Sequence, residues 1–439
     1  NHALTPNSFC TPARAAVLTG KYSHKNGVTR LNQLFDGSQQ TFPKLLQKAG
    51  YNTALFGKWH LLSKPTGFDH YCVMKMQGMP MDPIVFEPQH KWIPWSPKDQ
   101  KTYNKGGRRL KGFNNDAITD EALAWLEQKR DKTKPFCLLL HPKPPHEPYL
   151  PAPPKYKDYL SDVTIPEPAT LYDDYKGRTP EAIQKTMRSN LILRKPSFKK
   201  YREEIRKQNP DITDKEMLAK LYQIYIKGYY RLVKSVDDNV GRLRKRLREL
   251  GVADDTLVWF TSDNGPEGQP DSGLGSTGPF TGRKRSLREG GVRVPGIVEW
   301  PARLAPAVTG VVAGTVDTLP TVLSAAGLPL PEATLDGVDL GPALRGEPTD
   351  RGRGMGFRHK GAEAWTRGRW KIHRKGDQPF TLHDLEADVL DRGVHGEGQV
   401  GGQGPRRRGP GPKARVLVLE LESDREAGVL AALVAVLLR

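Results

Sequence analysis

Over its first 300 residues the chain alternates amphipathic helical patterns with short apolar runs, and this alternation constrains the fold more than any other feature. Apolar residues spaced three and four apart indicate helices, and short β-branched or aromatic runs indicate buried strands. The helices are predicted at 41–49, 116–130 and 213–250, and the strands that follow them at 51–56, 136–140 and 256–260. Such an order is typical of an α/β fold, a mainly parallel sheet with helices on both faces.

Polar residues follow each of the three predicted strands directly. Gly57 to His60 come after the first strand, His141 and His146 after the second, and Thr261 to Gly265 after the third. In open α/β sheets, ligands bind at the carboxyl ends of the strands. We therefore expect one functional site at this edge of the sheet, although each residue alone could be a loop or surface residue.

Cys10 opens a short motif, Cys-Thr-Pro-Ala-Arg, which continues to Leu-Thr-Gly at residues 18–20. Thr11 suits a helix cap and Pro12 a first helical position, so Cys10 is predicted at a helix amino terminus. The free N–H groups and the helix dipole favour an anion there, and Arg14 lies one turn further on. A lone cysteine is more often an inert buried thiol, so the motif by itself leaves both readings open.

The chain carries 68 lysine and arginine residues against 49 acidic ones, a formal net charge of +19. Much of the excess lies in residues 183–250, which hold 19 basic and 8 acidic residues. A basic helical surface attracts nucleic acid, anionic lipid or an anionic polymer, or is simply solvated. No nucleic-acid motif accompanies it, so we expect no nucleic-acid partner. No apolar run approaches the roughly 18 residues of a transmembrane helix, and we expect no transmembrane segment.

Around these motifs the sequence resembles the type I, formylglycine-dependent sulfatases of the alkaline phosphatase superfamily. Five blocks match the family in order, and a chance match of all five is negligible. They are the Cys10 motif, Gly57-Lys58-Trp59-His60-Leu61, Lys143-Pro144-Pro145-His146, Ser262-Asp263-Asn264-Gly265, and Lys284 with 289–295. The resemblance covers residues 1–388 and implies an alkaline phosphatase-like fold and a sulfuric ester hydrolase.

The resemblance implies that Cys10 is converted to formylglycine by a formylglycine-generating enzyme, and that the hydrated aldehyde attacks sulfur. Arg14 and Lys58 would stabilise this nucleophile. His60 would take the proton when the sulfated intermediate breaks down and the aldehyde is regenerated. A covalent intermediate divides one difficult transfer into two easier steps.

The same resemblance implies that His146 and Lys284 hold the sulfate oxygens and assist departure of the alcohol. Asp263 and Asn264 would join Cys10 as ligands of Ca²⁺, with Mg²⁺ as the alternative ion. Fixed cations and a hard metal ion suit a sulfate ester, because its negative charge is spread over several oxygens.

The substrate is expected to be a sulfated carbohydrate or an aryl sulfate, and residues 65–69 together with 183–250 favour the carbohydrate weakly. Two alternatives stay open: an inactive anion-binding remnant, and a phosphate or phosphonate ester hydrolase on the same fold. Trp92, Trp95 and Tyr103 lie either in a packed loop or along a sugar-binding cleft. The family implies a secreted, periplasmic or lysosomal location, which the sequence itself does not indicate.

Residues 1–300 are interpreted as the catalytic domain, and 301–388 as the C-terminal part of the fold, with a small antiparallel sheet over 354–385. Residues 389–439 are predicted to be a disordered tail rich in Gly, Arg and Pro, and a gene-model error near 389 is one hypothesis for it. An alternative prediction for part of this tail is a helix over residues 417–438. Cys72 and Cys137 are expected in the core, or in a disulfide if the protein is secreted.

Family members carry a pair of adjacent aspartates upstream of the cysteine motif, which complete the metal site, and this chain does not contain them. Calcium takes about six to eight oxygen ligands, more than Cys10, Asp263 and Asn264 supply. We therefore expect an N-terminally incomplete sulfatase that is itself inactive or poorly folded.

Overall fold

The computed structural model describes residues 2–96, 102–168, 171–172, 192–267, 277–332, 334–387 and 431–437. Its strands are β1 (His2–Leu4), β2 (Asn52–Lys58), β3 (His70–Met74), β4 (Ile84–Val85), β5 (Arg108–Arg109), β6 (Phe136–His141), β7 (Thr256–Ser262), β8 (Gly296–Glu299), β9 (Val312–Gly314), β10 (Met355–His359), β11 (Ala362–Arg367), β12 (Trp370–Lys375), β13 (Thr381–Asp384) and β14 (Ala431–Leu437). Its helices are α1 (Cys10–Thr19), α2 (Ser23–Asn26), α3 (Phe42–Lys48), α4 (Asn114–Ala124), α5 (Lys199–Gln208), α6 (Asp214–Glu249), α7 (Glu289–Val292), α8 (Thr318–Ala325) and α9 (Gly341–Leu344), with shorter turns η1 (Trp125–Lys129), η2 (Pro154–Tyr156), η4 (Pro196–Phe198) and η5 (Thr315–Asp317).

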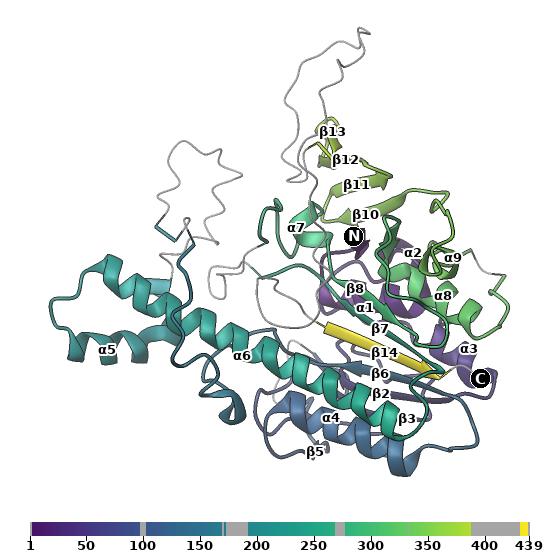
Figure 1. Ribbon diagram of the computed structural model, residues 1–439, viewed down its shortest axis with the longest axis horizontal. Helices are drawn as coiled ribbons and strands as arrows, with labels where there is room; N and C mark the ends of the chain where they lie inside the picture. Colours follow the sequence, from purple (N-terminus) through teal and green to yellow (C-terminus); the bar gives the residue numbers. More distant parts are fainter. Residues whose placement is uncertain are drawn as a thin grey trace, which may run out of the picture.

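The central sheet has the strand order β3-β2-β6-β14-β7-β8 (Figure 1). Strand β2 pairs in parallel with β3 and β6, while β14 runs antiparallel to both β6 and β7. Strands β3, β2, β6 and β7 therefore point the same way and end at the same edge. The predicted helices and strands around this sheet are confirmed, with boundaries shifted by a few residues.

Side chains on the two faces of the sheet enter two separate cores, as the period of two in a strand requires. Leu55 of β2 packs with Phe42 of α3 and Leu323 of α8 on one face. Phe56, its neighbour in sequence, packs with Leu243 of α6 on the other face, where α4 also lies. Helices thus cover both faces, as predicted.

Cys72 and Cys137 belong to opposite cores, Cys72 on the α4/α6 face and Cys137 on the α1/α3/α8 face. Both are buried free cysteines. The disulfide alternative is therefore wrong, because the sheet separates the two thiols.

The small antiparallel sheet predicted over 354–385 is confirmed as β10-β11-β12-β13, which lies at the top of Figure 1. It is joined to the rest of the fold by a buried ion cluster around Glu289 of α7. Lys371 Nζ of β12 lies 2.8 Å from Glu289 Oε1, and Arg293 lies 2.7 Å from Oε2. Burial disfavours the carboxylate, but Lys371 and Arg293 hold the pKa of Glu289 below its ordinary value.

Helix α6 begins and ends where the sequence predicts. Thr213 and Glu216 form a capping box at its start, and Gly251, with a φ of 65°, follows its end. Its first part and α5 extend away from the sheet in Figure 1 and share an apolar cluster that includes Leu218, Tyr225 and Phe198. The basic stretch lies largely on these two helices, and its residues 183–191 are outside the described part of the chain.

The prediction of a disordered tail is wrong for Ala431–Leu437, and so is the helix proposed for 417–438 at these residues. They form β14, which pairs with β6 on one side and β7 on the other. The backbone of this apolar run pairs with the N–H and C=O groups along the facing edges of β6 and β7. Without β14 these groups would have no partner in the sheet. The rest of the tail lies outside the described residues. Among the described residues, no helix is long and apolar enough to cross a membrane.

Gly57 shows why the end of β2 needs glycine. Its φ is 95°, and a Cβ at this position would lie 2.1 Å from the backbone oxygen of His141 on β6. Gly50 has a similar φ of 90°, but a Cβ there would meet nothing within 4 Å.

We therefore expect Gly57→Ala to lower the free energy of unfolding more than Gly50→Ala does. Gly50→Ala incurs only the backbone penalty, about 1–2 kcal/mol, whereas Gly57→Ala also forces two strands apart and should cost at least about 2 kcal/mol more. Denaturant unfolding of the two variants measures the difference. Equal losses would show that β6 moves aside freely.

Candidate functional site

The buried guanidinium of Arg14 joins α1 to the ends of three strands. One of its terminal nitrogens lies 2.7 Å from the backbone oxygen of Lys58 at the end of β2 and 3.2 Å from Nδ1 of His141 at the end of β6. Its Nε and its other terminal nitrogen lie 3.2 and 3.1 Å from Asp263 Oδ2, just beyond β7. The predicted convergence of the three strand ends is confirmed.

Cys10 is fully buried in the first turn of α1, with its Sγ 3.5 Å from Asn264 Oδ1. The predicted capping arrangement is wrong in detail: the helix begins at Cys10, and Phe9 is the N-cap. Thr11 instead accepts a hydrogen bond at 3.3 Å from the backbone N–H of Asn32, and Pro12 is the third helical residue. The helix therefore begins two residues earlier than predicted, and Cys10 is its first residue rather than the residue before the cap.

Two lysines supply buried positive charge. Lys58 is fully buried, and its Nζ has no hydrogen-bond partner among the described residues. Burial lowers the pKa of Lys58 to about 8. Lys284 Nζ lies 3.4 Å from Glu267 Oε2. Burial opposes the charge of Lys284, but Cys10, Glu267 and Asp263 raise its pKa above the ordinary value.

His60 and His146 are neutral, because burial and the nearby charge of Lys58 hold both pKa values well below 6.5. His60 Nε2 donates to Asn32 Oδ1 at 3.0 Å, which leaves Nδ1 buried, without a partner among the described residues and able to accept a proton. His146 Nδ1 donates to the backbone oxygen of Glu147 at 2.9 Å, which leaves its Nε2 as the acceptor.

Asp263 and Asn264 fit part of a calcium site. Asp263 Oδ1 is buried and unpartnered within the described part of the chain, although its Oδ2 is held by Arg14. Burial disfavours the carboxylate, but Arg14 and Lys58 keep the pKa of Asp263 below its ordinary value. Together with an oxygen at position 10 these side chains offer three donors, against the six to eight that calcium takes.

A second group of potential ligands consists of Cys72 of β3, Glu87 and Glu121. Arg108 occupies its centre, 3.0 Å from Glu87 and 2.9 Å from Glu121. Since the arginine already neutralises the carboxylates, we interpret this group as a structural ion cluster.

Four residues of the site were missed or left open by the sequence. The sequence places His141 after the second strand and Lys143 in the histidine block and leaves open whether they touch substrate or are structural. In the structure His141 contacts Arg14 directly and Lys143 Nζ donates to the Glu147 oxygen at 3.0 Å. Asn32, which orients His60, and Glu267, which pairs with Lys284, carry no local motif. Only the contacts of the folded chain identify them.

Residues 1–328 match the family model described as Sulfatase. The chain therefore belongs to the sulfatase family, and its sheet has the architecture of the alkaline phosphatase superfamily. It is similar to the N-acetylglucosamine-6-O-sulfatase of Bacteroides thetaiotaomicron, with 35% identity over 78% of this chain and 63% of the relative. It is also similar to the N-acetylgalactosamine-6-sulfatase of Mus musculus, with 27% identity over 84% of this chain and 63% of the relative. The chain thus spans less than two thirds of the length of these relatives.

Solved structures give the same fold. A protein in complex with its substrate D-glucosamine-2-N,6-O-disulfate matches with a TM-score of 0.72 and 29% identity, covering 89% of this chain and 84% of that one. A phosphonate monoester hydrolase of Agrobacterium radiobacter matches with a TM-score of 0.55 and 18% identity, covering 89% of this chain and 82% of that one, a similarity that shows the fold alone.

Removing the guanidinium should leave Asp263 as an uncompensated buried charge. We expect Arg14→Met to lower the free energy of unfolding by about 3–5 kcal/mol, the usual loss when one partner of a buried pair is removed. Arg345→Met, at a half-exposed pair with Glu347, should cost less than about 1 kcal/mol. Denaturant unfolding compares the two, and similar losses would contradict the central position of Arg14.

His141 should make the fold sensitive to acid. Burial and Arg14 lower the pKa of His141 to about 3, so the unfolded chain takes up this proton below about pH 6.5 while the folded chain does not. The contribution of His141 to the free energy of unfolding is therefore complete above pH 6.5 and decreases as the pH falls toward 3. At pH 5 it is lower by about 2 kcal/mol. Unfolding at pH 7 and pH 5 should show a smaller difference for His141→Gln than for the native chain. The exposed variant His24→Gln is the control, and an unchanged difference in His141→Gln would refute the assignment.

Proposed function

We propose that this chain is a sulfuric ester hydrolase that removes sulfate from a sulfated carbohydrate. The observation that carries the proposal is the buried Cys10 at the amino terminus of α1, whose Sγ faces Asn264 Oδ1. The nearby amine of Lys58 has no hydrogen-bond partner in the described part of the chain. A family resemblance supplies the reaction class, and the arrangement of charges supports it independently.

The described residues suit a bound anion. A sulfate ester carries one negative charge spread over its terminal oxygens, and fixed cations in a water-poor site stabilise it strongly. Lys58 and Lys284 supply cations, and the first N–H groups of α1 add the positive end of the helix dipole. The guanidinium of Arg14 is already engaged by Asp263, Lys58 and His141, so we assign it the role of positioning these groups.

The proposed nucleophile requires conversion of Cys10 by a formylglycine-generating enzyme, and the hydrated aldehyde would supply a hydroxyl for attack and a second one for release of sulfate. His60 Nδ1 would accept a proton, since its Nε2 is fixed by Asn32. His146 would donate one to the departing alcohol. A bound anion offsets the charges of Lys58 and Lys284, which raises the pKa of His146 toward the range where it can act as an acid.

A divalent cation would be held by Asp263 Oδ1, Asn264 Oδ1 and an oxygen at position 10. We propose Ca²⁺, with Mg²⁺ as the alternative, since all three donors are hard oxygens. Such an ion polarises the sulfate group when it is bound.

The proposed substrate class rests on the relatives. One curated relative is named for N-acetylglucosamine 6-sulfate, and a similar solved structure contains a disulfated glucosamine as its substrate. We therefore choose N-acetylglucosamine 6-sulfate as the first substrate to test.

A second function, binding of sulfated sugars without turnover, is favoured by one observation. Asp263 Oδ1, Asn264 Oδ1 and an oxygen at position 10 supply at most half of the about six to eight oxygen ligands that calcium takes. A chain that binds the sulfate ester through Lys58 and Lys284 but cannot complete the metal site would retain the substrate and release no product.

One experiment separates these functions by using the same chain with and without conversion of Cys10. Protein produced together with a formylglycine-generating enzyme should show loss of the thiol mass in the peptide that ends at Arg14. It should release sulfate from N-acetylglucosamine 6-sulfate at least about 10³ times faster than unconverted protein, because the nucleophile is missing from the latter.

The control is identical in every other residue, so a difference in folding cannot explain the result. Equal release by converted and unconverted protein would refute the proposed nucleophile. Binding of the ester without release by either form would support the anion-binding alternative.

A further inference from the structure

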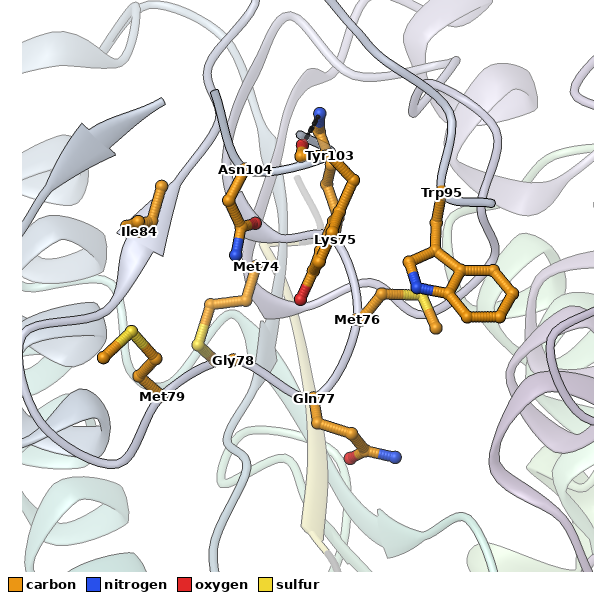
Figure 2. A pocket seen from close by; sticks show the side chains of 10 residues that line it. All are labelled: Met74, Lys75, Met76, Gln77, Gly78, Met79, Ile84, Trp95, Tyr103 and Asn104. Carbon is orange, nitrogen blue, oxygen red and sulfur yellow. Dashed lines mark hydrogen bonds between the residues drawn. The ribbon is translucent and has the colours of Figure 1, made fainter. Parts of the chain in front are cut away.

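A cavity of about 250 Å³ is lined by the segment that follows β3 and by Trp95, Tyr103 and Asn104 (Figure 2). Met74, Lys75 and Met76 line it together with Trp95 and Asn104, and in Figure 2 Trp95 and Asn104 lie on opposite sides of Lys75. Binding pockets for drug-sized molecules commonly measure about 300–1,000 Å³. The cavity is therefore suited to a single small ring.

The cavity adjoins the site already described. Lys58 of β2 and Met74 of β3 are paired in register, and neighbouring strands lie about 4.8 Å apart. Beyond the strands, the backbone N–H of Trp59 donates to the Met74 oxygen at 2.9 Å, and that of His60 donates to the Lys75 oxygen at 3.0 Å. The cavity wall and the segment that carries Lys58 and His60 are thus hydrogen-bonded to each other.

The walls are mainly apolar and include one aromatic face. Met76 lies beside the Trp95 ring in Figure 2, while Met79 and Ile84 lie on the other side. Methionine side chains adapt to irregular shapes, and an aromatic face packs well against the C–H face of a sugar ring. Trp92 differs from Trp95: its Nε1 donates to the Leu62 oxygen at 3.0 Å, and its partly buried ring packs against the core.

One polar group in the cavity wall lacks a partner. Gln77 Oε1 is buried, and no described residue donates a hydrogen bond to it. Buried acceptors in folded proteins are nearly always paired, so this atom, which has no donor among the described residues, is the acceptor we assign to a bound ligand. The Asn104 amide also lines the cavity and points into the middle of the group in Figure 2.

The cavity offers no free charge. Lys75 is the one charged residue among those that line it, all of which the structure describes. Its Nζ donates to the backbone oxygens of Ile93 at 3.0 Å and Tyr103 at 2.7 Å and lies 3.5 Å from the Phe86 ring centroid. The occupant is therefore neutral, in contrast to the anion expected beside Lys58.

We propose that this cavity binds the uncharged part of the substrate, a hexosamine ring whose N–H or O–H group donates to Gln77 Oε1 and whose apolar face lies on Trp95. Gln77 and Asn104 are then specificity residues for the alcohol portion of the ester. This inference rests on the proposed function, because it assigns one end of the same substrate.

The test compares Gln77→Ala and Asn104→Ala with Gln378→Ala, which removes an exposed glutamine between β12 and β13. For converted protein, the quantity measured is kcat/KM for N-acetylglucosamine 6-sulfate divided by kcat/KM for an aryl sulfate. We expect this ratio to fall about tenfold in each cavity variant, the effect of one lost hydrogen bond. It should not change in Gln378→Ala. Circular dichroism and the melting temperature check that each variant is folded.

A second measurement does not require turnover. Saturation-transfer NMR of N-acetylglucosamine, which carries no sulfate, measures its dissociation constant for the native chain and for each variant. The constant should rise about tenfold in Gln77→Ala and Asn104→Ala but not in Gln378→Ala.

The outcomes distinguish the two proposals. If the sugar binds the native chain and Gln77→Ala equally, or does not bind the native chain, the cavity assignment is overturned whatever the enzyme activity. If binding depends on Gln77 but converted protein hydrolyses no sulfate ester, the cavity assignment stands and the proposed hydrolysis fails.

Discussion

The site depends on one buried guanidinium. Arg14 holds the backbone oxygen of Lys58, the ring of His141 and the carboxylate of Asp263 at once, so it sets the relative positions of α1 and the ends of β2, β6 and β7. A lysine could not do the same, because its single ammonium lacks the planar set of five N–H donors. The catalytic assignment of Cys10 and the proposed cation both depend on this arrangement, since each uses groups that arrive on different elements.

The charges divide the proposed substrate site into two environments. Lys58 and Lys284 make one side strongly positive, and burial together with this field keeps the pKa values of His60 and His146 low. On the side of β3, by contrast, Lys75 is fully engaged by backbone oxygens. A molecule with an anionic end and a neutral ring matches both environments, whereas a small inorganic anion matches only the first.

The sequence predicted most of the sheet, because long amphipathic helices and buried strands such as α6 and β6 leave clear periodic patterns. It also predicted which strand ends converge, since parallel strands must end at one edge. It did not predict β14, because seven apolar residues have no strand or helix signature of their own and acquire a conformation only by pairing with β6 and β7. Asn32 and Glu267 could not be predicted either, because their importance lies in single contacts across the fold. The catalytic and metal roles remain predictions, as does the domain boundary near residue 300.

The ion cluster of Glu289, Lys371 and Arg293 bears on that boundary. Lys371 belongs to the small sheet, while Glu289 follows the loop that carries Lys284, and both side chains are almost completely inaccessible to water. A protein truncated before residue 371 would lack Lys371, and the buried carboxylate of Glu289 would lose this cation. Truncations in this region should therefore abolish folding rather than leave a shortened but working protein.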